Sequence, residues 1–119
     1  MGLDERRKFY RVDSINLLNY VYRTNGGEEE LQGMGRTLNI SESGILLETH
    51  VPIEEGFVLS LMIGLEDDLV VVIKGTVVFM LPNAKGRFES GIKFLEMDDK
   101  SFKTLKAYIA AFRAYQKMS

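Results

Sequence analysis

NLLNYVYRTNGG, residues 16–27, predicts a β-strand that runs into a tight turn. Side chains alternate between the two faces of an extended chain, and both faces of this strand carry apolar or aromatic residues. One face holds Leu18, Tyr20 and Tyr22, and the other holds Ile15, Leu17, Asn19 and Val21. We therefore expect a strand that is covered on both sides. The Asn-Gly-Gly run supplies the positive φ of a hairpin turn, so a second strand should follow over residues 31–40.

The chain continues as short strands separated by turns. Further strands are predicted over residues 45–48, 57–63, 69–79 and 87–96, between segments rich in Gly, Pro, Asn and acidic residues. Gly33 and Gly35 in the second strand, and Lys74-Gly75 in the fifth, indicate bulges or bends where a sheet curls towards closure. Six short antiparallel strands with such bends favour a small closed barrel.

The last part of the chain changes to a helical period. Asp98 or Asp99 can cap the helix, and apolar residues then recur at three- and four-residue spacing. These apolar residues are Phe102, Leu105, Ile109 and Phe112. The predicted fold class is mostly β (α+β), with a six-stranded antiparallel barrel over residues 13–97 and a C-terminal helix over residues 98–119 packed on it. A basic segment over residues 1–12 precedes the barrel.

Composition argues against several classes of protein. The chain has 119 residues, which is one domain by size, with no cysteine and a net charge of −2. A protein that coats DNA is strongly basic, so we expect no general DNA binding. No apolar run approaches the ~20 residues that span a bilayer, and the N-terminus has no apolar signal region. We therefore expect a cytoplasmic protein without membrane insertion.

No residue pattern predicts catalysis or a bound metal. His50 is the single histidine, and it has no cysteine or second histidine with which to form a metal site. The chain contains no G-x-S-x-G, G-x-G-x-x-G or P-loop motif. The carboxylate pairs Glu54-Glu55 and Asp67-Asp68 lie in predicted turns. We expect no enzyme activity, no catalytic residue, no metal and no cofactor.

The first basic stretch is the strongest candidate for a binding site. Residues 6–11 hold four cations and two aromatic side chains. Arg7 and Arg11 are four residues apart, so their guanidinium groups lie on one face of either a helical turn or an extended segment. Each guanidinium is a planar, bidentate donor that matches a phosphodiester or a guanine edge, which lysine cannot reproduce.

A second candidate lies between the second and third predicted strands, at Asn39-x-Ser41-x-x-Gly44. Asn and Ser side chains bond to nearby backbone, and Gly accepts strained φ and ψ angles, so these residues form a turn without any ligand. For an isolated hexapeptide, a structural turn is the simpler interpretation.

The two stretches together resemble the PilZ domain family. Arg7-x-x-x-Arg11 followed by Asn39-x-Ser41-x-x-Gly44 is similar to its R-x-x-x-R and D/N-x-S-x-x-G motifs. Gly91-Ile92-Lys93-Phe94 looks like the family's final-strand G-x-x-F, and a helix follows. The resemblance covers essentially the whole chain.

PilZ domains are receptors for cyclic di-GMP, so the resemblance implies this ligand. It implies that Arg7 and Arg11 contact the phosphates and the Hoogsteen edges of guanine, whose O6 and N7 are acceptors. It also implies hydrogen bonds to the ligand from Asn39 and Ser41, and close approach of backbone at Gly44. An arginine directly before R-x-x-x-R tends to accompany two stacked ligands in this family, which implies a role for Arg6.

Residues 1–12 have few apolar anchors, so we expect them to be mobile alone and to order over the barrel on binding. The signal would then pass to an unidentified partner protein.

Two other functions stay open. A PilZ-like module can bind a protein and no nucleotide, although such members typically lack the arginines. A small barrel can also bind single-stranded nucleic acid by stacking bases on aromatic side chains. The sequence does not define the oligomeric state.

Overall fold

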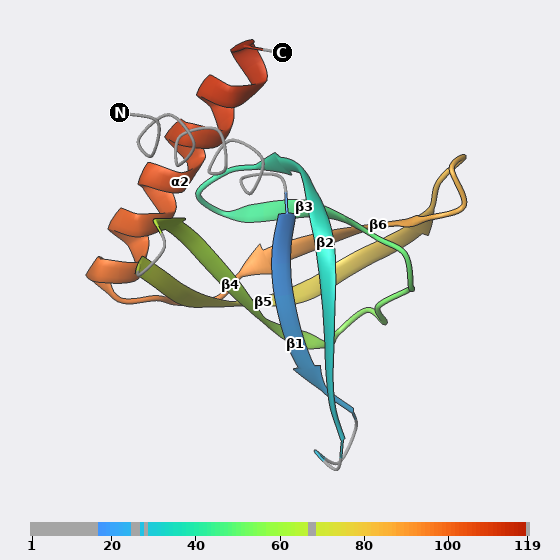
Figure 1. Ribbon diagram of the computed structural model, residues 1–119. Helices are drawn as coiled ribbons and strands as arrows, with labels where there is room; N and C mark the ends of the chain where they lie inside the picture. The colour runs from blue at the N-terminus through green and yellow to red at the C-terminus, as the bar shows by residue number, and fades with distance from the viewer. Residues whose placement is uncertain (1–16, 25–26, 28, 67–68, 119) are drawn as a thin grey trace.

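The computed structural model describes residues 17–24, 27, 29–66 and 69–118. It contains β1 (Leu17–Arg23), β2 (Glu30–Ile40), β3 (Gly44–Thr49), β4 (Val58–Glu66), β5 (Leu69–Pro82), β6 (Phe88–Phe94) and α2 (Asp99–Met118). The strands form a closed antiparallel barrel in the order β1-β2-β3-β6-β5-β4, and α2 follows the last strand (Figure 1). The predicted fold class is therefore confirmed.

The barrel closes because β1 has a partner on each side. It pairs with β2 along its whole length and with β4 over residues 19–22. The β1–β2 hairpin extends away from α2 beyond the other strands (Figure 1). At its tip Thr24 N donates to Glu29 O at 2.9 Å, and Gly27 adopts a φ of 70°. A turn glycine with positive φ is therefore confirmed at this hairpin.

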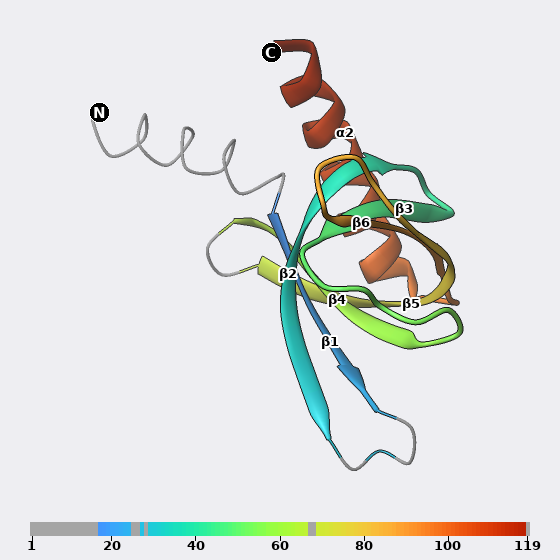
Figure 2. The same cartoon turned by 90° about the vertical axis from the view of Figure 1, so that its right-hand side faces the viewer.

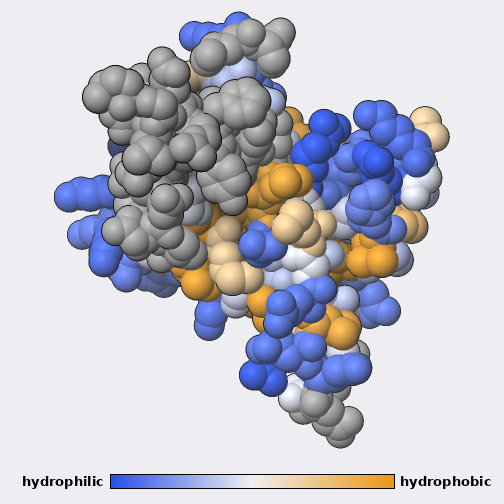
Figure 3. Space-filling view, viewed as in Figure 1, coloured by the Kyte–Doolittle hydropathy of each residue, from blue (hydrophilic) through white to orange (hydrophobic). Residues whose placement is uncertain are grey.

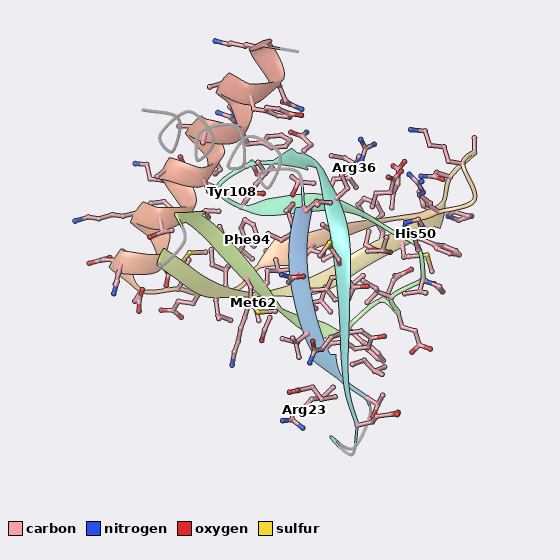
Figure 4. The ribbon with its side chains drawn as sticks, viewed as in Figure 1. Arg23, Arg36, His50, Met62, Phe94 and Tyr108 are labelled. Carbon is pink, nitrogen blue, oxygen red and sulfur yellow. The ribbon has the colours of Figure 1, made fainter. Side chains whose placement is uncertain are left out.

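The helix α2 lies against the barrel and completes its core (Figure 2). Asp98 caps the helix, because its Oδ1 accepts a hydrogen bond from Ser101 N at 2.8 Å. Tyr108 lies between α2 and the barrel (Figure 4), where its Oη is 3.2 Å from Thr37 Oγ1 of β2 in a buried hydrogen bond. The buried helix residues are Thr104, Leu105, Tyr108, Ile109 and Phe112.

One of the four apolar residues at helical spacing, Phe102, is not buried. Phe102 is 36% exposed, because it lies in the first turn, before the part of the helix that is buried against the barrel. Its ring instead lies under the ammonium of Lys106, at 5.6 Å from the ring centroid. Tyr108, which the apolar spacing did not include, is buried in the core.

The first two strands also differ from the prediction in their burial and in the absence of a bulge. Leu17 is 50% exposed and Asn19 is exposed, so β1 is buried only on the face of Leu18 and Tyr20. Gly33 and Gly35 mark no bulge, because the β1–β2 register is continuous through both. The Tyr20 ring packs on Gly33, and Leu47 packs on Gly35, in the space that a Cβ would occupy.

The register shifts that bear on the outer wall lie elsewhere than predicted. Register is continuous at Lys74 and Gly75, but it shifts between Thr37 and Asn39 and between Val77 and Phe79. Each shift adds one residue, Leu38 in β2 and Val78 in β5. An added residue reverses the alternation of side chains beyond it. Thr37 and Val77 are therefore buried, whereas Asn39 and Phe79 are exposed on the outer face.

The wall formed by β2, β1, β4 and β5 has a register shift between Gly64 and Glu66, but its register is continuous through the residues considered next. Asn19 lies opposite Met34 on one side and Met62 on the other, and Met62 lies opposite Val72. These four side chains form one transverse line on the outer face, which we term the regular row. Met34 is 53% and Val72 is 54% exposed. Apolar side chains gather around β1 on the face that Figure 3 presents.

Among the residues that the structure describes, no helix has the length and apolarity to cross a membrane.

Candidate ligand groove

The turn between β2 and β3 is shaped by its own polar side chains. Ser41 N donates to Gly44 O at 2.9 Å, and Ser43 N donates to Ser41 Oγ at 3.3 Å. Asn39 Oδ1 accepts a hydrogen bond from Ile40 N at 2.9 Å. These bonds are those of a structural turn, as the isolated motif predicts. They leave the amide nitrogen of Asn39, which is an exposed residue, without a bond to any residue that the structure describes.

Gly44 is required in this turn for a different reason from the predicted one. The described glycines with positive φ are Gly27, Gly56 and Gly86, so strained backbone angles do not explain Gly44. A Cβ at Gly44 would instead overlap the carbonyl oxygen of Ile92 on β6. The backbones of β3 and β6 therefore approach closely at this glycine.

A groove of about 450 Å³ lies beside the turn, on the outer face of the barrel. The motif residues Asn39, Ser41 and Gly44 all contribute to its lining, together with residues of β3, β5 and β6. Lys93 is the only charged side chain among the described residues that line it. The barrel thus brings the three motif residues to one edge of a shared surface.

The strand register arranges the groove residues in order. Asn39 lies opposite Leu46, Leu46 opposite Gly91, and Gly91 opposite Phe79. We term this line the groove row; it crosses β2, β3, β6 and β5 over about 14 Å, from the usual strand spacing of about 4.8 Å. In the neighbouring line, Gly44 lies opposite Lys93.

A buried carboxylate supports the same wall beside the groove. Glu48 of β3 accepts a hydrogen bond from Asn83 Nδ2 at 2.9 Å and forms ion pairs with Arg36 and Arg87 at 3.4 and 3.3 Å. Its side chain is 4% exposed. Burial raises the pKa of Glu48, but the bond from Asn83 and the charges of Arg36 and Arg87 outweigh burial, so the net pKa is lowered. Arg36 extends from β2 toward the β5–β6 hairpin (Figure 4).

The sequence-predicted site residues fall into two groups. Asn39, Ser41 and Gly44 lie together at the groove, whereas Arg6, Arg7 and Arg11 lie outside the described residues. Sequence reasoning missed Phe79 and Lys93 as groove residues. The pattern of β5 could not reveal Phe79, because strict alternation gives it the same buried face as Val77.

The comparisons with known proteins identify the family. A model described as PilZ domain matches residues 5–111, so the chain belongs to the PilZ domain family. The search of curated proteins found no match.

Solved structures show the same fold. The PilZ domain of YcgR from Escherichia coli, with c-di-GMP, superposes with a TM-score of 0.63 at 10% identity over 86% of both chains. MotI/DgrA from Bacillus subtilis, an inhibitor of motility, gives 0.60 at 20% identity over 82% of this chain and 47% of its own. The K. pneumonia MrkH–c-di-GMP complex gives 0.55 at 14% identity over 85% and 48%. The chain thus spans about half the length of the last two proteins.

Proposed function

We propose that this protein is a receptor for cyclic di-GMP. The observation that carries the proposal is that Asn39, Ser41 and Gly44, in a chain of the PilZ family, lie together at one groove. Two of the similar structures, those of YcgR and MrkH, hold c-di-GMP. The groove lies on the outer face of the barrel, so a nucleotide would lie along the surface and not inside the barrel, whose interior is filled by the core.

Each motif residue has a role that its surroundings support. The Asn39 amide nitrogen, which bonds to no described residue, is a donor at the groove edge, and Ser41 adds a hydroxyl to the same lining. Many family members have aspartate where this chain has Asn39. The amide keeps the acceptor oxygen but loses the charge, so we expect the change to alter affinity more than specificity. Gly44 has no side chain, so the β3 backbone is uncovered at this edge and a ligand can approach it closely.

Residues 1–12 act as the clamp in this proposal. Arg7 and Arg11 bind phosphate oxygens and the O6 and N7 acceptors of guanine in bidentate fashion. Ligand binding orders residues 5–11 over the barrel, and the ordered surface binds a partner protein. Arg6 reaches a second, stacked ligand molecule. The protein acts through this partner and catalyses no reaction.

Calorimetry tests the proposal. Cyclic di-GMP should bind saturably, and GMP and linear dinucleotides much more weakly. Arg7→Ala and Arg11→Ala should each weaken binding by about 1–3 kcal/mol, the scale of a lost bidentate guanine contact. Arg11→Lys should lose much of the same binding, because lysine lacks the fork. Arg113→Ala, on the exposed side of α2, is the matched control and should bind normally.

Absence of binding at tens of micromolar ligand would contradict the proposal and favour the protein-interaction module. Binding of single-stranded oligonucleotides in preference to cyclic di-GMP, with a steep dependence on salt, would favour the nucleic-acid barrel.

Hydrogen exchange tests the clamp separately. Amides of residues 5–11 should exchange fast in the free protein and become protected with cyclic di-GMP, while the barrel strands change little. Protection before ligand is added would contradict the ordering step. A calorimetric ratio of one ligand per chain would contradict the role of Arg6 alone.

A further inference from the structure

The floor of the groove has a feature that neither sequence motif includes. The groove row begins at a motif residue, Asn39 on β2, and ends at an aromatic residue, Phe79 on β5. Each of these two end residues directly follows an added residue, Leu38 or Val78. If the same sequences were paired without a bulge, strict alternation would place Asn39 on the buried face of Thr37 and Phe79 on the buried face of Val77. Two separate irregularities therefore direct a polar and an aromatic side chain to the same external groove.

Gly91 determines how the Phe79 ring lies. A Cβ at Gly91 would overlap the Cε2, Cζ and Cδ2 atoms of that ring, so the ring rests directly on the β6 backbone. Gly91 itself is buried beneath it, yet Phe79 is 42% exposed. One side of the ring is thus covered by the strand, and the remaining surface is open to the groove. A large aromatic surface held this way loses little freedom when a flat ligand covers it.

The charge beside this ring is positive. Lys93 is exposed, lies two residues along β6 from Gly91, and pairs with Gly44 of the motif turn. The groove therefore offers an aromatic surface at one end, a cation next to it, and amide and hydroxyl groups at the other end. A planar aromatic base joined to a phosphate matches this order of groups.

We propose that Phe79, seated on Gly91, is a stacking platform for one guanine base of the ligand, and that Lys93 contacts the adjoining phosphate. The proposal rests on the proposed binding of cyclic di-GMP and adds a recognition element on β5 and β6 to the two motifs. Base stacking on an aromatic side chain is worth enough that its loss should weaken binding about 10- to 100-fold.

Removal of the Phe79 ring tests the platform. Phe79→Ala should weaken cyclic di-GMP binding about 10- to 100-fold in calorimetry with little loss of stability, because the side chain is on the surface. Phe102→Ala, which removes another exposed aromatic ring, is the control and should bind like the wild type. Normal binding by Phe79→Ala, while Arg11→Ala loses binding, would overturn the platform and leave the receptor function intact.

Gly91→Ala tests whether the glycine acts through the ring. Alone, it should displace Phe79 and weaken binding about 10-fold or more. In the Phe79→Ala background the added methyl meets no ring, so it should have little further effect. Equal losses in both backgrounds would show that Gly91 serves only the backbone of β6 and would overturn its seating role.

The chain contains no tryptophan, which allows a direct optical test. Phe79→Trp should retain binding, and its fluorescence should be quenched as cyclic di-GMP saturates the site, since a stacked base contacts the indole. Phe102→Trp should show no quenching. Unchanged fluorescence in Phe79→Trp despite calorimetric binding would contradict stacking.

Lys93→Gln should weaken binding about 3- to 10-fold and reduce its salt dependence; an unchanged salt dependence would remove the phosphate contact from the proposal.

Discussion

The outer wall of the barrel has two transverse rows that differ in construction. The regular row, Met34, Asn19, Met62 and Val72, follows strict alternation across β2, β1, β4 and β5. The groove row, Asn39, Leu46, Gly91 and Phe79, crosses β2, β3, β6 and β5, and both of its end residues follow an added residue. A further register shift, between Gly64 and Glu66, lies outside the regular row. A bulge costs strand pairing, so the two that come directly before the end residues of the groove row are where side chains are turned outward.

The two rows also differ in their support. The regular row rests on the apolar core through neighbours such as Leu18 and Leu61, both buried. The wall next to the groove row contains the Glu48 cluster, in which one buried carboxylate is held by residues of β2 and of the β5–β6 hairpin. The comparison predicts that substitutions on the groove side affect stability, binding or both, whereas those in the regular row affect neither.

The largest effect should come from Gly44→Val. The new side chain would clash with the Ile92 carbonyl, and we expect a loss of about 3 kcal/mol in the free energy of unfolding. Urea denaturation measures the loss, and cyclic di-GMP binding should fall with it. Val72→Ala in the regular row should change stability by no more than about 0.5 kcal/mol. Equal losses in the two variants would remove the structural distinction between the rows.

Glu48→Gln should give the next largest effect, about 2 kcal/mol at pH 7, because two arginines lose their charged partner. The folded-state pKa of Glu48 is lowered, so its contribution is present above the ordinary value of 4.5 and is lost as the pH falls through the folded-state pKa. The difference between wild type and Glu48→Gln should therefore shrink in acid. Glu55→Gln, in an exposed loop, is the control and should leave the stability at pH 7 unchanged within about 0.5 kcal/mol. A difference that is constant between pH 7 and pH 3 would contradict the ionic role.

Ser41→Ala should separate binding from folding. Within the protein the Ser41 hydroxyl only closes a surface turn, so its removal should cost less than about 1 kcal/mol of stability, while cyclic di-GMP binding weakens more. Met34→Ala in the regular row should leave binding unchanged. If Ser41→Ala lowered the melting temperature as much as Gly44→Val and left binding intact, the turn would be purely structural.

The smallest effect on ligand binding should come from the contact between α2 and β2. Tyr108→Phe and Thr37→Val each remove one partner of the buried 3.2 Å hydrogen bond, and each should cost about 1 kcal/mol. A double-mutant cycle should give a positive coupling between them. Thr37 immediately precedes the added residue Leu38, so loss of this bond should also weaken ligand binding slightly. Strictly additive losses would show that the bond does not hold the bulged strand to the helix.

The pattern of residues was sufficient to predict the fold class and one part of the candidate site. Alternation and turn residues predicted the strands, the change of period at Asp98 predicted the helix, and together they predicted a six-stranded barrel. The spacing of Asn39, Ser41 and Gly44 identified the turn that borders the groove. These features could be predicted because they depend on local geometry, in which side chains two, three or four residues apart share a face.

The tertiary structure alone decided which residues depart from that local geometry. Glycine suggested bulges or bends at Gly33, Gly35 and Gly75, but each of these accommodates a side chain from a neighbouring strand. The register shifts instead lie at Leu38, Leu65 and Val78. The need for glycine at position 44 is explained by the carbonyl of Ile92, which is 48 residues further along the chain. Barrel closure sets the register of distant strands, and no local pattern records it. For that reason the motif residue Asn39 could be found in the sequence, whereas its counterpart Phe79 was found only when β5 was seen beside β6.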